Sequence, residues 1–313
     1  RIADRATVVV QGECSLDLLS DMRLRLDAGR LTATADEGVV GFTVETPDAY
    51  VKDIGTRFGV AVSSAGSDIV VFDGEVEVSA VDSAVKKGPT RLTAGEAVRW
   101  RENRLPERIS SVVSEGESEE WTAVPDELAD GAIATVTDNV ESRSSYHFYP
   151  VLRKGMNEGV LAWPYETNKP RWWSVSGEGL PAELAGADIV QMLQQELENK
   201  ELRIDIRLAR PSRLFVFFEK DAPVPEWLER EFRRLPVELR LSPDAPQVAR
   251  KLGREPRYAV RFEVWTRDVL EAGKATLSAV DKRDENSPPF YMYGVAAKSL
   301  TDFEKEKHSG ESK

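Results

Sequence analysis

The sequence is poor in the residues that build most reactive sites. Cys14 is its single cysteine, so no disulfide can form within the chain and cysteine pairing gives no information about the compartment. Its two histidines are His147 and His308, which excludes a zinc site built on several histidines. The Gly-x-Ser-x-Gly elbow, the phosphate loop and the dinucleotide fingerprint are all missing. The sequence therefore predicts no catalytic residues, no metal site and no cofactor.

Long apolar runs are missing too, and the charge has one dominant sign. No run approaches the roughly 18 residues of a membrane-spanning helix, and no signal peptide is recognisable. The chain has 54 acidic against 42 basic residues, a net charge of -12, which argues against nucleic acid as a partner. The chain opens at Arg1 and enters a strand-like run, Thr7–Val10, almost at once. We therefore expect a trimmed extracytoplasmic fragment.

Residues 1–107 are predicted to form a β domain. Short apolar runs alternate with turn residues, and no helical periodicity of useful length appears. Val76 and Val78 alternate with glutamates, as in a sheet with one face in water. Asp73-Gly74 between two such runs predicts a hairpin, and Asp27–Gly29 predicts another turn. This part should be a β roll or sandwich.

Residues 108–145 are predicted to be an acidic linker between two domains. Between Ser110 and Ser142 there are nine acidic residues and no lysine or arginine. Like charges at this density disfavour a compact structure, and the run that begins at Ser114 is typical of a solvated connector.

Residues 146–302 are predicted to form a second, jelly-roll-like β-sandwich with a short helix. Leu202–Leu208 alternates apolar and polar residues, and Leu214–Phe218 is apolar throughout, as in a strand buried on both faces. The helix is expected at Pro225–Phe232, where the apolar residues share one face. The charged tail, 303–313, is expected to be disordered. The predicted fold class is all-β.

Five short segments follow one another in residues 5–100: Leu26–Leu31, Phe42–Pro47, Gly55–Phe58, the Asp73-Gly74 turn and Leu92–Glu96. In the order and spacing of these segments, residues 5–100 resemble the FecR-type sensory domain of bacterial envelope regulators. Residues 146–300 resemble a β-sandwich appended to some FecR-like proteins.

The resemblance implies a non-catalytic sensory or scaffold part of a regulator of an extracytoplasmic-function sigma factor. Family members typically join a cytoplasmic segment, which controls the sigma factor, to a periplasmic sensor through one membrane helix. The expected location is therefore periplasmic, with an N-terminal membrane helix outside this chain as the anchor. The sigma factor would be reached only through the missing cytoplasmic segment. The expected partner of the chain itself is an envelope polysaccharide or an envelope signalling protein.

Two groups of residues are candidate sites. The motif residues Gly55, Thr56, Arg57 and Phe58, with Asp73 and Gly74, could form a recognition loop, but glycine turns and core aromatics in β domains are more often structural. The densest cluster of aromatic and polar residues could bind a ligand such as a sugar: Trp163, Tyr165, Arg171, Trp172 and Trp173.

The aromatic cluster has a structural alternative. Trp172 and Trp173 are adjacent, so on a strand they point to opposite faces and only one of them can line a groove. Packing in the core is the commoner role of tryptophan. The alternative function is a carbohydrate-binding or carbohydrate-active envelope protein, and a two-carboxylate glycosidase stays open because its acid and nucleophile carry no local motif.

Overall fold

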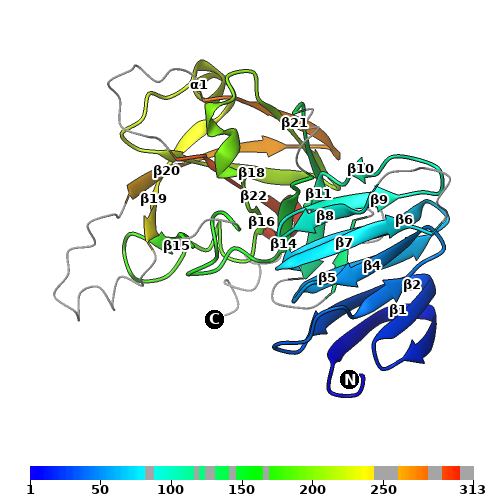
Figure 1. The fold of residues 1–313 in the computed structure, drawn as a ribbon. Helices are drawn as coiled ribbons and strands as arrows, with labels where there is room; N and C mark the ends of the chain where they lie inside the picture. Colours follow the sequence, from blue (N-terminus) through cyan, green and yellow to red (C-terminus); the bar gives the residue numbers. More distant parts are fainter. Residues whose placement is uncertain are drawn as a thin grey trace. The chain divides into compact units, whose positions relative to one another are not determined.

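The computed structural model describes residues 1–81, 88–115, 120–123, 131–140, 146–164, 169–242, 260–280 and 291–303. The chain divides into two compact units, each with its own hydrophobic core. Unit 1 comprises Arg1–Ser110 and Glu141–Phe148, and unit 2 comprises Ser111–Val140 and Tyr149–Lys313. Both units are built from strands, and the helices that the structure describes are short (Figure 1). The predicted all-β fold class is confirmed.

Unit 1 is one continuous sheet that folds over on itself. Its strand order is β10-β9-β6-β5-β2-β3-β4-β7-β8, and β1 pairs with β2 beside this path. The strands are β1 (Ala6–Ser20), β2 (Arg23–Ala35), β3 (Thr43–Glu45), β4 (Ala49–Asp53), β5 (Arg57–Ser63), β6 (Gly66–Asp73), β7 (Glu75–Ala80), β8 (Thr90–Thr93), β9 (Ala97–Trp100) and β10 (Glu107–Arg108).

The sheet folds over along β2, which belongs to both halves of the roll. The start of β2, Arg23–Arg25, pairs in parallel with β3, whereas its later part, from Gly29 to Thr34, pairs antiparallel with β5. Apolar side chains from both halves meet in one core, among them Leu24, Val51 and Val60. Burying such side chains is worth about 1.5–3 kcal/mol each, which stabilises the closed roll.

The predicted turn at Asp27–Gly29 is wrong, because these residues lie inside the continuous strand β2. Gly29 has φ +99°, and a β-carbon there would clash with the Cys14 sulfur and the Glu13 carbonyl oxygen. The pairing of β1 with β2 is also irregular between Gln11 and Ser15. The glycine therefore marks a bulge that bends the strand pair from one half of the roll to the other.

The predicted hairpin at Asp73-Gly74 is also wrong. β6 pairs with β5 and β9, and β7 pairs with β4 and β8, so the two strands that flank the turn are not partners. Gly74, at φ +76°, instead turns the chain from one half of the roll to the other. The apolar alternation on both sides was read correctly, because Ile69, Val71, Val76 and Val78 are all buried.

Unit 2 contains a nine-stranded sheet and a three-stranded sheet, which share one core. The first has the order β12-β11-β14-β16-β22-β18-β20-β19-β15 and the second β13-β17-β21. The strands are β11 (Ser111–Glu115), β12 (Trp121–Thr122), β13 (Ile133–Asp138), β14 (Tyr149–Arg153), β15 (Arg171–Ser174), β16 (Asp188–Val190), β17 (Arg203–Leu208), β18 (Ser212–Glu219), β19 (Arg233–Ser242), β20 (Val260–Val269), β21 (Gly273–Ser278) and β22 (Gly294–Ser299).

The short helix of unit 2 lies where the sequence predicts it. Helix α1, Glu226–Glu231, follows Pro225, which occupies its N-cap position. Trp227 and Leu228 are buried, and the indole nitrogen of Trp227 donates a hydrogen bond to the Ala279 carbonyl at 3.0 Å. The 3-10 helix η2 spans Gln194–Glu198. Of the predicted tail, Phe303 is described and packs against the core of unit 2, while the remainder lies outside the described residues.

The linker predicted over 108–145 is wrong for the residues that the structure describes. Ser111–Glu115 forms β11, which pairs in parallel with β14, and Ile133–Asp138 forms β13, which pairs with β17. Trp121 in β12 is only 2% exposed. The negative charge misled the prediction because the apolar residues of this segment are buried in strands with distant partners. The first boundary nevertheless falls near Ser110, close to the predicted position.

Candidate functional site

A polar pocket of about 870 Å³ lies at one end of unit 1. It is formed where four separate segments meet: β2, the β3–β4 link, the β5–β6 turn and the residues that follow β9. The described residues that line it are Asp27, Ala28, Pro47, Asp48, Val62, Ser63, Ser64, Ala65, Gly66, Arg101, Glu102 and Arg104. Because the segments are far apart in the sequence, no local sequence motif predicts this pocket.

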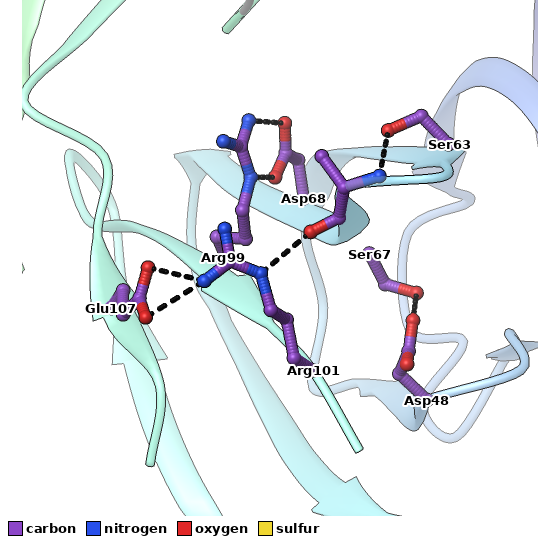
Figure 2. Close-up of polar contacts among 8 residues, drawn as sticks. Asp48, Ser63, Ser67, Asp68, Arg99, Arg101 and Glu107 are labelled. Carbon is purple, nitrogen blue, oxygen red and sulfur yellow. Dashed lines mark hydrogen bonds and ion pairs between the residues drawn. The ribbon is translucent and has the colours of Figure 1, made fainter. Parts of the chain in front are cut away.

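Asp48 is the most firmly held carboxylate of the pocket. The Ser67 hydroxyl donates to Asp48 Oδ2 at 2.6 Å (Figure 2). The backbone N–H of Glu102 donates to Asp48 Oδ1 at 3.2 Å. The Thr46 hydroxyl oxygen, in turn, accepts the backbone N–H of Ala49 at 2.9 Å and fixes the turn into β4. The carboxylate is therefore oriented before any ligand arrives, which lowers the entropy cost of binding.

Arg101 closes the pocket on the side of the β5–β6 turn. Its Nε donates to the Ala65 carbonyl at 2.7 Å, and its Nη1 donates to both carboxylate oxygens of Glu107, at 2.8 and 2.9 Å (Figure 2). Beside it, Arg99 and Asp68 form a two-point ion pair at 2.6 and 2.7 Å. The hydrogen bond from Arg99 to Asp68 raises the pKa of Arg99. The Arg99–Asp68 pair joins β9 to β6, and the Arg101–Glu107 pair joins the end of β9 to β10.

Arg104 and Glu102 are charged lining residues whose side chains have no partner among the described residues. Among the described residues, no side-chain hydrogen bond or ion pair of Arg104 is found, and its side chain is exposed. The pocket thus offers a guanidinium as well as fixed carboxylates, a combination that suits a polar ligand bearing an anionic group and hydrogen-bond donors. The described lining residues include no histidine or cysteine, the groups that most readily exchange protons near neutral pH.

The Gly55–Phe58 motif has a structural role at the corner beside Gly74. Gly55 has φ +91°, the Thr56 hydroxyl donates to the Glu75 carbonyl at 3.0 Å, and Phe58 is fully buried. The Arg57 guanidinium lies over the Phe72 ring, 4.9 Å from its centre. The motif therefore joins the start of β5 to the β6–β7 corner, and none of its residues lines the pocket.

The same corner contains a buried acid that the sequence did not single out. Asp53, the last residue of β4, is fully buried. Burial raises the pKa of Asp53, and the backbone N–H groups of Gly55, Thr56 and Ile54 offset only part of that effect. A carboxyl next to Gly55-Thr56 could have been flagged by its position, but its burial depends on the fold.

The aromatic cluster of unit 2 is packed in the core. Trp163 and Trp172 are 2% and 0% exposed. Trp172 meets the rings of Phe217 and Phe262 edge-on, with centroids 5.2 and 4.8 Å apart, and Trp163 stacks on Tyr291 at 5.3 Å. Neither indole face is available to a sugar ring in this arrangement. Both tryptophans therefore pack in the core, which is the structural alternative stated above.

Arg171 and Trp173 of the predicted ligand cluster make hydrogen bonds to the backbone. Arg171 Nη1 donates to the Gly159 carbonyl at 2.6 Å, and the indole N–H of Trp173 donates to the Ser242 carbonyl at 3.0 Å. Trp173 is half-buried on the opposite face of β15 from Trp172, as the alternation predicts. Tyr165 lies outside the described residues.

A second pocket, of about 490 Å³, lies on unit 2 beside β19 and β20. Its lining includes Glu238 and Glu263, which are direct cross-strand partners. Arg234 binds Glu263 at 2.8 Å, and Lys220 binds Glu238 at 2.6 Å. The Lys220 hydrogen bond lowers the pKa of Glu238, the opposite of what a general acid requires. This carboxylate pair is therefore arranged as an ion-pair network.

The described residues contain neither a metal-binding cluster nor a membrane-spanning helix. No group of three or more histidine, cysteine, aspartate or glutamate side chains lies close enough to hold a metal ion in the part of the chain that the structure describes. Over the same ranges, no helix has the length and apolar character needed to cross a membrane.

A family comparison identifies unit 1. The model of the FecR protein family matches residues 2–77, and this part of the chain is a FecR-type domain, which confirms the resemblance read from the sequence. The matched residues run from the entry into β1 to the middle of β7, so the family assignment covers most of the roll and none of unit 2. Among proteins of curated function, none matches the sequence.

Two proteins of solved structure resemble the chain with low sequence identity and low TM-scores. A candidate anti-sigma factor from Parabacteroides distasonis is 23% identical, with a TM-score of 0.27, over 34% of this chain and 50% of that chain. A β-glucuronidase from glycoside hydrolase family 2 is 11% identical, with a TM-score of 0.40, over 88% of this chain and 33% of that chain. The chain thus spans half of the first protein and a third of the second. Neither likeness is close enough to carry a function over.

Proposed function

We propose that this chain is an extracytoplasmic sensory part of a FecR-like regulator and that it acts by binding. The observation that carries the proposal is the FecR-type domain at residues 2–77. Its output would be control of an extracytoplasmic-function sigma factor, and its place would be the periplasm. The chemistry of unit 1 supports binding, because its polar pocket combines an oriented carboxylate, Asp48, with an exposed guanidinium, Arg104.

The sensory step would take place at the pocket of unit 1. Asp48 is oriented by Ser67 and by the Glu102 backbone, while the Arg104 guanidinium is open to solvent. A ligand or partner segment that carries an anionic group would pair with Arg104 and donate hydrogen bonds to Asp48. Because four chain segments meet at the pocket, an occupant would tie β2, the β5–β6 turn and the residues after β9 together. That coupling is the physical basis for a signal.

The carbohydrate alternative has less support. Its motivation was a groove lined by tryptophans, and Trp163 and Trp172 are both buried in the core of unit 2. A catalytic version would need a carboxyl held in its protonated form, whereas the pKa of Glu238 in the second pocket is lowered. A polysaccharide or envelope protein remains a candidate occupant for the pocket of unit 1.

The test is a sigma-factor reporter in cells that carry the gene for this chain. Deleting the gene should change reporter output, and Arg104→Glu in the pocket should alter the response in the same direction as the deletion. Lys200→Glu is the matched control, since it makes the same charge change at an exposed residue of unit 2. Protease added to spheroplasts should cleave the protein. A reporter indifferent to the deletion would refute the regulatory role.

A further inference from the structure

Beyond Ala6, which is bridged by Ile2, strand β1 has one edge without a strand partner among the described residues. It spans Ala6–Ser20, 15 residues, and pairs along one side with β2. Among the residues that the structure describes, no strand pairs with its other side. In Figure 1 β1 and β2 are the dark-blue strands of unit 1. The outward backbone N–H and C=O groups of such an edge strand are a template for another strand.

The apolar row of the core continues onto β1 and becomes exposed there. Val10 is paired with Leu31, Leu16 with Leu26, and Leu18 with Leu24, so each pair shares one face of the sheet. The three β2 leucines are 0–1% exposed, whereas Val10, Leu16 and Leu18 are 44%, 37% and 59% exposed. The inward face of β1 is therefore apolar, like a core, but it is not buried by other described residues.

A bulge divides this edge into two halves. Pairing with β2 is regular from Ala6 to Gln11 and again from Leu16 to Leu18. Register shifts lie between Gln11 and Ser15, between Ser15 and Leu16, and between Leu18 and Ser20. Val10 lies in the first half, and Leu16 and Leu18 lie in the second. Strands in sheets are usually about 3–10 residues long, so a short partner strand can pair on either side of the bulge.

We propose that the occupant of this edge is β1 of a second copy of the chain, paired antiparallel about a two-fold axis near the bulge. The first half of one β1 would then pair with the second half of the other. Val10 of each copy would approach Leu16 and Leu18 of the other copy, so that the exposed apolar residues of both copies are covered. The result is a symmetric dimer joined by a continuous sheet.

Charge at the two ends of β1 selects this arrangement. Arg5 precedes the strand and Asp21 follows it, and both side chains are exposed. Neither side chain makes a hydrogen bond or ion pair with another described residue, although their positions flank the free edge. Antiparallel pairing brings each Arg5 to the partner's Asp21, whereas parallel pairing would set arginine against arginine and aspartate against aspartate. The ends therefore favour the two-fold arrangement over the parallel one.

Sedimentation velocity of the purified chain over a range of concentrations tests the proposal. The chain should sediment as a dimer, and the double variant Leu16→Lys/Leu18→Lys should sediment as a monomer. Leu270→Lys is the matched control, because Leu270 is 73% exposed on unit 2 and should leave the dimer intact. Circular dichroism checks that each variant keeps its strands. A monomer at every concentration would overturn the proposal and leave the edge to a segment of another protein.

A charge exchange tests the orientation separately. Arg5→Asp places like charges together at both ends of the interface and should weaken the dimer about tenfold, a modest effect because exposed ion pairs contribute little. Adding Asp21→Arg to that variant restores opposite charges and should restore the affinity. The antiparallel arrangement would be contradicted if the double lysine variant still dimerised. It would also be contradicted if adding Asp21→Arg did not restore the dimer affinity that Arg5→Asp reduces.

Discussion

The two units have cores of different composition. The core of unit 1 is mostly aliphatic, with Phe42, Phe58 and Trp100 as its buried phenylalanines and tryptophan. The core of unit 2 contains interlocking aromatic rings, centred on Trp172 between Phe217 and Phe262. Aromatic rings bury more surface each and pack in defined edge-to-face geometries. A single substitution should therefore remove more stability from unit 2 than from unit 1.

The units also differ in how they hold polar groups. In unit 2, buried Asp188 accepts backbone N–H groups of Ala132, Ile133 and Lys154, and lies 3.7 Å from buried Arg153. Its charge fixes chain segments inside the core. In unit 1 the fixed carboxylate Asp48 instead lines an open pocket. The two carboxylates therefore differ in access, because Asp188 is enclosed in the core of unit 2, whereas Asp48 lines the pocket at which we propose that binding takes place.

The largest expected effect is on the aromatic core of unit 2. Trp172→Ala should reduce the free energy of unfolding of unit 2 by about 3–5 kcal/mol, because a fully buried ring is replaced by a cavity. Trp173→Ala is the control on the same strand, and its loss should be smaller because Trp173 is half-buried. Urea denaturation measures both. Equal losses would show that the two faces of β15 do not differ as described.

The next effect sharpens the view of unit 1 as a folded-over sheet. A β-carbon at Gly74 would clash with the Gly55 carbonyl and lie 2.8 Å from Thr56 Cγ2, in addition to the cost of φ +76°. Gly74→Ala should therefore destabilise unit 1 by about 2–4 kcal/mol. Gly38→Ala is the matched control: its φ is +79°, but the site is open, so about 1 kcal/mol is expected. Thermal unfolding would contradict this if the two variants lost the same stability.

A third prediction compares similar ion pairs in the two units. Arg99–Asp68 in unit 1 and Arg213–Asp268 in unit 2 both use Nε and Nη2, but the Asp68 side chain is 5% exposed and that of Asp268 is 37% exposed. Asp68→Asn should cost about 1–3 kcal/mol, since it leaves a desolvated guanidinium poorly paired. Asp268→Asn should cost less than about 1 kcal/mol. The opposite order would refute the burial argument.

The smallest prediction concerns pH. Burial raises the pKa of Asp53 in the folded state, so the folded protein binds this proton more tightly than the unfolded chain does. Stability from this group is therefore greatest below the unfolded pKa of about 3.9 and falls as pH rises through the folded pKa. Asp53→Asn should raise the melting temperature of unit 1 relative to the native chain at pH 7, and this gain should shrink toward pH 4. A gain independent of pH would contradict the assignment.

Local patterns predicted most strands but not their partners. The alternation in Leu202–Leu208 and the apolar run in Leu214–Phe218 correspond to β17 and β18, because side-chain burial on a strand has a period of two. Asp73-Gly74 was taken for a hairpin because turn chemistry is local, whereas β6 and β7 pair with strands elsewhere in the roll. Strands β11 and β13 were not predicted within the acidic segment, because their burial depends on pairing with the distant strands β14 and β17.

The candidate site could be predicted only in part. The Gly55–Phe58 motif was recognised and its structural role follows from glycine and phenylalanine chemistry. The pocket of unit 1 was missed, because Asp48, Arg101 and Arg104 come from different segments and no spacing connects them. The burial of Trp163 and Trp172 likewise depends on contacts with distant residues, such as Tyr291 and Phe262. From the sequence alone, Trp163 and Trp172 could belong either to the core or to a ligand-binding groove.

The central claim is that a FecR-type unit with its own core is joined to a second unit with a separate core. Differential scanning calorimetry of the whole chain tests it most directly. The account predicts two unfolding transitions: Gly74→Ala lowers the temperature of one by several degrees, and Trp172→Ala lowers the temperature of the other. A single transition that both substitutions shift together would contradict it, because the two cores would then unfold as one.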